Sequence, residues 1–291
     1  MKRILLITVL FICSMTVVHA QIFYKVEEKG VTSPSYIFGS HHLSPIDIVE
    51  KSGAKEYFDS TEQVVGEIDL TMDPIKISLA LQSHMMAPAD STLSILLKDE
   101  DMASLNAQFE KWSPMHGLTL EMLDPLKPMA VSTMIAVGIS ADVMPGYDPS
   151  MQLDRYFFEE GKKDGKNIIA LESPDYQGEV LFDMTPLEIQ AELLIDMLKN
   201  PEKTVESAKK LTKAYQEKDM NGMLELSKEN DEHPEFMENI LYKRNKEWMN
   251  KLPGILRDKP SFIVVGALHL AGPEGIIEGL REQGFEITPI Y

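Results

Sequence analysis

Residues 261–270 read SFIVVGALHL, and residues 35–43 read SYIFGSHHL. Each segment contains a serine, an aromatic residue and a run of β-formers, followed by the pattern Gly-x-x-His-Leu. Short apolar runs that end at glycine are typical of buried strands in an α/β sheet. The two segments therefore predict two buried strands, each followed three residues after its glycine by an imidazole, His42 in the first and His269 in the second.

A third run of the same kind, VVGEID at residues 64–69, ends in carboxylates. Open α/β sheets bind ligands at the carboxyl edge of their strands, so His42, His269 and Glu67 are expected within reach of one ion if their strands are neighbours. Glu67 lies in an otherwise apolar stretch, and its charge therefore requires a partner. Two imidazoles and one carboxylate form a recurrent set of ligands for a divalent metal. The alternative is that each histidine is a structural residue held by hydrogen bonds.

The remaining apolar patterns predict an α/β (α+β) fold. Strand-like runs occupy residues 22–26, 36–38, 63–68, 168–171, 261–265 and 285–289. Apolar residues at three- and four-residue spacing predict helices at residues 102–112, 128–139, 151–162, 186–198, 202–218 and 233–252, the last ending before Pro253-Gly254. We therefore expect a central mixed sheet flanked by helices, with a large helical insertion, in one domain over residues 21–291. A separate helical domain at about residues 72–165 is the alternative.

The start of the chain has the pattern of a secretory signal. Residues 1–20 begin with Lys2 and Arg3, continue in an apolar run up to Cys13 and end in Val-His-Ala. We expect cleavage before residue 21 and export to the periplasm or beyond. A lipoprotein signal is not favoured, because the bulky Ile12 precedes the cysteine. The apolar run is too short to span a bilayer comfortably, and no later segment predicts a membrane span.

The composition restricts the chemistry. The 291 residues include 46 acidic and 28 basic side chains, a net charge of −18, so binding to nucleic acid is not expected. Cys13 is the only cysteine, so the processed chain would have no disulfide and no thiolate ligand. A metal site would then use imidazoles and oxygen ligands. The sequence makes no prediction of the oligomeric state.

Five blocks of the sequence, in this order and spacing, resemble the TraB/GumN (TraB/PrgY/GumN) family, which includes the Tiki proteins. The blocks are FGSHH at 38–42, VVGEID at 64–69, LES at 171–173 with Gln177, Arg244-Asn245, and VVGALHLAGPEG at 264–275. The resemblance spans about residues 35–290. It implies a fold similar to that of erythromycin-esterase and ChaN-like proteins. It also implies metal-dependent proteolysis, because Tiki proteins are described as metal-dependent proteases with two Gly-x-x-His motifs and an essential glutamate.

Carried over to this sequence, the resemblance implies a metal held by His42, His269 and Glu67, with Gly39 and Gly266 as the motif glycines. The implied ion is manganese, cobalt or zinc. The family commonly has Gly-Thr-aliphatic-His at the first motif. Here Ser40 keeps a hydroxyl and His41 replaces the aliphatic residue. Ser40 is expected beside the ligands, and His41 is expected either to point the other way by alternation or to lie beside the ligands without binding the ion.

The mechanism that follows is hydrolysis by a metal-activated water. Glu172 is the best remaining carboxylate for handling the proton, because it follows a strand as Glu67 does. Arg244 is expected to stabilise an oxyanion or to pair with a carboxylate. Asn245 and Gln177 are expected nearby in supporting positions. Alternatively, Glu172 and Gln177 cap the helix that follows.

The sequence therefore predicts an exported metal-dependent hydrolase, a peptidase acting on a peptide or protein substrate. The alternative is a non-catalytic protein on the same scaffold that sequesters a peptide signal, haem or iron. Ser40 is not favoured as a nucleophile beside His41, because neighbours on an extended segment face opposite ways and no nucleophile elbow surrounds them. Asp154 is expected to be a helix cap or a solvated acid.

Overall fold

The computed structural model describes residues 21–31, 33–41, 44–97, 99–113, 115–143, 152–229 and 233–291. The signal peptide expected at residues 1–20 and the expected metal ligand His42 lie outside these described residues.

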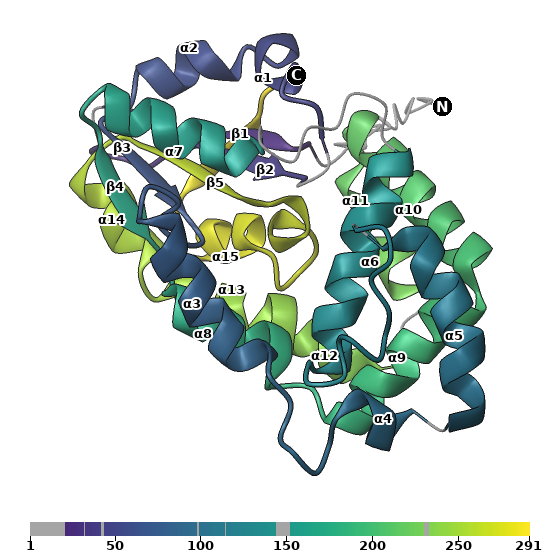
Figure 1. Cartoon of the computed structure of the whole chain (residues 1–291). Helices are drawn as coiled ribbons and strands as arrows, with labels where there is room; N and C mark the ends of the chain where they lie inside the picture. Colours follow the sequence, from purple (N-terminus) through teal and green to yellow (C-terminus); the bar gives the residue numbers. More distant parts are fainter. Residues whose placement is uncertain are drawn as a thin grey trace, which may run out of the picture.

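Six strands form one sheet at the centre of the molecule, in the order β4-β3-β5-β2-β1-β6 (Figure 1). The strands are β1 (Phe23–Glu27), β2 (Ser35–Ser40), β3 (Gln63–Gly66), β4 (Asn167–Ala170), β5 (Ser261–Gly266) and β6 (Glu286–Pro289). β4, β3, β5 and β2 run parallel, whereas β1 is antiparallel to both β2 and β6. All six predicted strands are present, and the mixed sheet predicted from the sequence is confirmed.

The register of the parallel strands brings the chemistry-bearing segments to one edge. β5 lies between β2 and β3, with Gly266 opposite Ser40 and Val264 opposite Gly66. The two Gly-x-x-His strands are therefore neighbours, as the hypothesis of a shared ion requires, and the Glu67 strand is the other neighbour of β5. The segments that follow β2, β3 and β5 all leave the sheet at its carboxyl edge, which explains why residues far apart in the sequence meet there.

The helices account for most of the rest of the chain. They are α1 (Ile48–Lys51), α2 (Ala54–Asp59), α3 (Pro74–Met85), α4 (Leu93–Leu96), α5 (Asp99–Trp112), α6 (Pro128–Val143), α7 (Leu153–Lys163), α8 (Pro174–Phe182), α9 (Leu187–Lys199), α10 (Pro201–Gln216), α11 (Met220–Lys228), α12 (Pro234–Met237), the π-helix η1 (Glu238–Tyr242), α13 (Lys243–Met249), α14 (Leu252–Asp258), the 3₁₀ turn η2 (Ala267–Leu270) and α15 (Ile276–Glu282). No helix among the described residues is long and apolar enough to cross a membrane.

The end of the helix predicted at residues 233–252 differs from the structure. The helix expected at residues 233–252 is a run of α12, η1 and α13 that ends at Met249, and Pro253 lies in the first turn of the next helix, which begins at Leu252. Proline has no N–H to lose in a first turn, where that group would have no partner within the helix. Pro253 therefore belongs to the first turn of α14, whereas the sequence pattern was interpreted as the end of the preceding helix.

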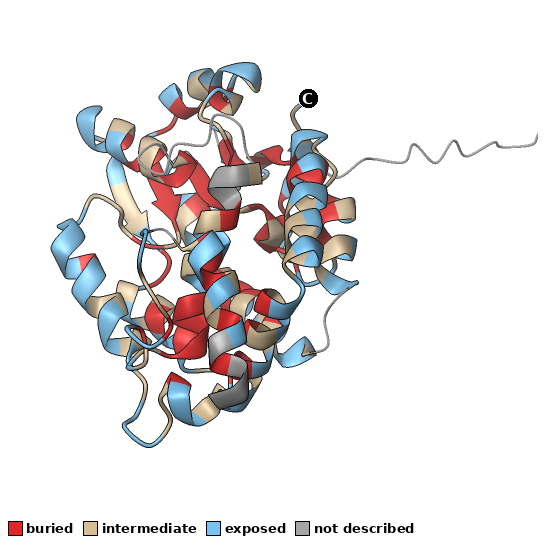
Figure 2. Ribbon diagram, turned by 45° about the vertical axis from the view of Figure 1, so that its right-hand side comes forward, coloured by how far each residue is buried: buried red, intermediate tan, exposed pale blue. Residues whose placement is uncertain are grey.

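The apolar side chains form two main cores. The larger core surrounds the sheet and includes Phe38, Phe157, Phe262 and Trp248. A second core joins α4, α5, α6 and α9 through residues such as Phe109. Figure 1 places these helices, with α10 and α11, to one side of the sheet, and Figure 2 shows buried residues concentrated in both regions. The helical insertion expected between the strands is therefore present, with its own apolar core beside the sheet.

Candidate functional site

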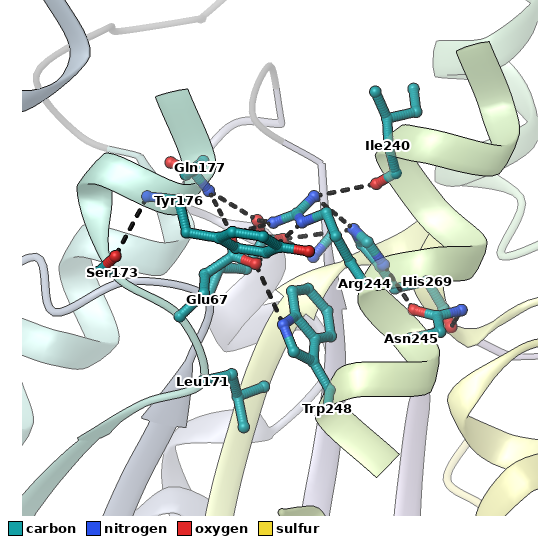
Figure 3. A network of polar contacts seen from close by, with 12 residues as sticks. Glu67, Leu171, Ser173, Tyr176, Gln177, Ile240, Arg244, Asn245, Trp248 and His269 are labelled. Carbon is teal, nitrogen blue, oxygen red and sulfur yellow. Dashed lines mark hydrogen bonds and ion pairs between the residues drawn. The ribbon is translucent and has the colours of Figure 1, made fainter. Parts of the chain in front are cut away.

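Five polar side chains from four elements or connections converge at the carboxyl edge of the sheet, in the region shown in Figure 3. Glu67 follows β3, and Glu172 lies just beyond β4. His269 is on η2, the single turn after β5, whereas Arg244 and Asn245 are adjacent on α13. The sequence analysis placed all five in or beside the site, and the structure brings them into one hydrogen-bonded network.

Arg244 is the centre of this network. Its Nη2 lies 2.5 Å from both Glu67 Oε2 and Glu172 Oε1, and its Nε donates to Glu172 Oε2 at 3.0 Å. Its Nη1 donates to the carbonyl of Ile240 at 3.1 Å and also lies 3.1 Å from His269 Nε2. Burial disfavours the charge, but the attraction of Glu67 and then of Glu172 raises the pKa of Arg244 above its ordinary value. The guanidinium is therefore a permanent positive charge in a side chain only 6% exposed.

Both carboxylate oxygens of Glu172 are engaged in hydrogen bonds. Its side chain is 2% exposed, and Trp248 Nε1 and Gln177 Nε2 donate to its two oxygens, each at 3.1 Å, in addition to Arg244. Burial raises the pKa of Glu172, while Arg244 opposes this shift. Because both oxygens of this carboxylate also accept from the guanidinium, the geometry favours Glu172 as the anchor of Arg244.

Asn245 determines which nitrogen of His269 faces the site. Its Nδ2 donates to the carbonyls of His269 at 3.1 Å and Glu274 at 2.9 Å, which leaves its Oδ1 as the acceptor, 2.7 Å from His269 Nδ1. In the neutral imidazole the proton is therefore on Nδ1, and the lone pair of Nε2 is directed toward Arg244 and Glu67. A fixed acceptor on the second ring nitrogen is the usual arrangement behind a metal-binding histidine.

Glu67 faces the same space from the other side. Its Oε1 accepts a hydrogen bond from the Gly266 amide at 2.9 Å and lies 3.9 Å from His269 Nε2, while Gln177 donates to Oε2 at 3.1 Å. A Cβ atom on Gly266 would lie 3.3 Å from Oε1 and 3.4 Å from His269 Cδ2. Glycine at this position therefore lets the carboxylate and the imidazole approach the end of β5 together.

The second motif glycine has a packing role. A Cβ atom on Gly39 would lie 2.9 Å from Leu270 Cδ1 and 3.0 Å from Ala267 Cα. Glycine thus allows the turn that carries His269 to pack directly against β2. The same reasoning explains why both Gly-x-x-His segments have glycine at the end of their strand, although neither residue has a positive φ.

Ser40 and His41 lie at the end of β2. The Ser40 hydroxyl donates to Asp154 Oδ1 at 2.8 Å, and both residues are buried. Asp154 is therefore neither a solvated acid nor the cap of α7, whose N-cap is Gln152. His41 is partly buried, with its ring centroid 5.1 Å from that of Tyr215. The contacts that place Ser40 and His41 are therefore with α7 and α10.

The capping alternative for Glu172 and Gln177 does not describe their contacts. Ser173 caps α8, since its Oγ accepts from the Tyr176 amide at 3.1 Å. Gln177 instead donates to Glu67 and to Glu172. Both residues therefore belong to the polar network rather than to the helix terminus.

Sequence reasoning missed one member of the network. Trp248 packs its ring against His269, at a centroid distance of 4.4 Å, and against the guanidinium of Arg244, 4.7 Å from Cζ. The available signal was helical spacing, because Trp248 lies four residues after Arg244 and so on the same helix face. The sequence analysis did not use this spacing.

The described residues supply part of a metal-binding set. Among them, no group of three or more His, Asp, Glu or Cys residues is arranged to hold a metal ion. Glu67 and the Nε2 lone pair of His269 provide two donors of the right chemistry, and the third expected donor, His42, lies outside the described part of the chain. The donor chemistry therefore fits a divalent ion, while Arg244 contacts the same two side chains.

Comparison with known proteins gives a consistent family assignment. The model of the TraB/PrgY/gumN family matches residues 22–289. The chain is 24% identical to Metalloprotease TIKI2 of Danio rerio, 25% identical to Metalloprotease TIKI2 of Xenopus tropicalis and 24% identical to Metalloprotease TIKI1 of Homo sapiens. Each alignment covers 87% of this chain but only 58%, 57% and 59% of the relative, so the chain spans less than two thirds of their length. No solved structure gives a significant match.

Proposed function

Because this chain belongs to the TraB/PrgY/gumN family, we propose that it is a metal-dependent peptidase whose divalent ion is held by His269, Glu67 and His42. One observation carries the proposal. Asn245 directs the lone pair of His269 Nε2 toward Glu67, whose nearer oxygen is 3.9 Å away. The names of the relatives, all metalloproteases, support the same reaction class.

The residues of the site then have distinct tasks. The bound ion would activate a water molecule and polarise the carbonyl of a peptide bond. Asn245 holds the ring of His269, and the Gly266 amide together with Gln177 holds Glu67. These contacts fix both donors before the ion arrives, which reduces the cost of binding it.

We propose that Arg244 stabilises negative charge on the substrate and that Glu172 positions it. The N–H groups of Arg244 face the space shared by His269 and Glu67, where the carbonyl oxygen of a peptide would become negatively charged. Glu172 binds the opposite side of the same guanidinium through two hydrogen bonds. This assignment replaces the proton-transfer role expected for Glu172, since its oxygens are already engaged.

We also propose that the protein acts outside the cytoplasm on a peptide or protein substrate. The signal-peptide pattern of residues 1–20 supports export. The high negative charge of the chain argues against a nucleic-acid substrate.

Metal content and chelator-sensitive cleavage test this function together. We expect about one divalent ion per chain and cleavage of a peptide library that stops when a chelator is added. His269→Ala and Glu67→Ala should each lose the ion and the cleavage. His116→Ala is the matched control, because this histidine is exposed and outside the network. Cleavage that persists in His269→Ala, or chelator-insensitive cleavage, would contradict the proposal, and retention of haem without cleavage would favour the binding alternative.

A further inference from the structure

We infer that Arg244 is an intramolecular competitor for the metal ion, and that its guanidinium sets the affinity of the site by engaging His269 Nε2 and the Glu67 carboxylate, two groups that would hold the ion. This inference rests on the proposed function, because it concerns the same Glu67 and His269 side chains. It adds a role for Arg244 before catalysis, at the step where the metal is taken up or lost.

The competition follows from the atoms that Arg244 contacts. Its Nη2 pairs with Glu67 Oε2 at 2.5 Å, and its Nη1 lies 3.1 Å from His269 Nε2. The imidazole nitrogen has one lone pair, which either accepts a hydrogen bond from Nη1 or coordinates an ion. An ion that takes Nε2 must therefore displace Nη1 from it.

The rest of the guanidinium is anchored, so displacement is partial. Nε and Nη2 both donate to Glu172, in the two-point geometry that makes arginine–carboxylate pairs strong. The ring of Trp248 lies against the same guanidinium, and the carbonyl of Ile240 on η1 accepts from Nη1. Arg244 can therefore lose its contact with His269 and keep its place beside the substrate.

Charge acts in the same direction as donor competition. The guanidinium is permanently positive, and its Nη1 is within hydrogen-bonding distance of a nitrogen that the divalent ion would use. Like charges in a buried setting repel more strongly than in water. Arg244 therefore weakens metal binding both by engaging the donors and by its charge, and the site fills only when free metal is abundant.

The size of the effect can be set from the contacts that the ion must break. A hydrogen bond to a charged group contributes enough to change an equilibrium constant by roughly ten- to a hundredfold. We expect a chain without the guanidinium to bind metal tighter by about that factor. Removal of Arg244 alone would leave Glu172 buried and unpaired, so the charge-balanced double variant Arg244→Met/Glu172→Gln is the appropriate test.

The experiment measures the affinity of Mn²⁺ for the full chain by calorimetry, with the free ion counted by electron paramagnetic resonance. Arg257→Met/Glu28→Gln is the matched control, because this solvent-accessible pair has the same two-point geometry and lies beside the starts of β2 and β5, at the opposite edge of the sheet from the site. We expect the Arg244 double variant to bind one Mn²⁺ at least tenfold tighter and the control to match the unaltered chain within twofold. Equal or weaker binding by a folded double variant would overturn the inference.

Two further variants distinguish a failure of the Arg244 inference from a failure of the proposed metal site. If the double variant does not fold, Arg244→Lys decides, since lysine keeps the charge but lacks the planar fork whose separate nitrogens contact Glu172 and His269. It should bind Mn²⁺ several-fold tighter, and unchanged affinity would refute donor competition. His269→Ala tests the proposed function separately: if it binds Mn²⁺ as well as the unaltered chain, the metal site itself is wrong, whatever Arg244 does.

Discussion

Replacement of Asn245 by leucine tests how the site prepares its histidine. Leucine has the same branching and number of side-chain heavy atoms as asparagine but removes the acceptor for His269 Nδ1–H and the donor to two carbonyls. Without that acceptor the proton of the imidazole is free to move to Nε2, where it blocks a metal. We therefore expect Asn245→Leu to bind Mn²⁺ roughly ten- to a hundredfold more weakly, the usual loss when the partner of a metal-binding histidine is removed.

The stability cost can be estimated from the same contacts. Asn245 and His269 are buried, so the ring N–H and the carbonyl of His269 lose their partner without gaining water. Each buried polar group left unpaired costs about 1–3 kcal/mol. With two such groups, the free energy of unfolding should fall by about 2–6 kcal/mol. The carbonyl of Glu274 is only partly buried and regains part of its hydrogen bonding from water.

Two companion variants separate the metal effect from general destabilisation. Asn239→Leu removes another buried asparagine of the same helical run, one that bonds Met184 and Lys243 rather than a histidine. It should lower stability without changing metal affinity. Asn245→Asp keeps an oxygen for His269 Nδ1–H, so it should bind metal more tightly than Asn245→Leu.

Urea denaturation, Mn²⁺ titration and ¹⁵N NMR of the histidine rings provide the measurements. In the unaltered chain the His269 ring should be the tautomer protonated at Nδ1, assigned by its disappearance in His269→Gln. If Asn245→Leu binds Mn²⁺ as tightly as Asn239→Leu, or if the ring of the unaltered chain is protonated at Nε2 when neutral, the reasoning is wrong.

Three other predictions follow from neighbouring contacts. A hydrogen bond to Asp183 raises the pKa of His84. The stability that this imidazolium contributes is therefore complete below about pH 6.5 and is lost as pH rises through the raised pKa. Between pH 6 and pH 9 the urea midpoint should fall less in His84→Gln than in the unaltered chain, and an equal fall would exclude this contribution. Gly266→Ala should weaken Mn²⁺ binding about tenfold, because its methyl group presses on a carboxylate and an imidazole of the site; titration with unchanged affinity would argue against that crowding. Trp248→Phe removes the indole N–H from the buried Glu172 carboxylate and should cost about 1–3 kcal/mol in chemical denaturation, a smaller loss meaning that water replaces the donor.

The sheet could be predicted from the sequence because its strands are short, apolar and bounded by glycine or polar residues. The likeness between residues 35–43 and residues 261–270 predicted two strands of the same kind, and the structure shows that they are neighbours. Strands buried on both faces have nearly continuous apolar runs, so they can be predicted without knowledge of their partners.

Helix α3 could not be read in the same way, and its residues show why. Ile75 and Leu79 are 68% and 60% exposed, and Ile77 is the one residue of α3 that is fully buried. An apolar pattern indicates a helix only when the apolar residues lie on the buried face. Here they lie largely on the solvent side, so spacing gave no signal.

The roles within the site depended on tertiary contacts. The family resemblance selected Glu172 and Arg244, but their pairing joins residues 72 positions apart in the chain. No local pattern states that one carboxylate anchors the guanidinium while Glu67 shares it with His269. The sequence thus predicted which residues meet, and the structure was needed to assign what each one holds.

The most direct test of the metal centre is a crystal of the protein soaked in Mn²⁺, with anomalous difference density recorded above the manganese edge. We predict one peak within about 2.0–2.3 Å of both His269 Nε2 and a Glu67 oxygen. His42 should approach the same peak, and Arg244 should have moved away from the imidazole while keeping Glu172. A map with no peak there, and with Arg244 still bonded to both Glu67 and His269 at saturating Mn²⁺, would contradict the account.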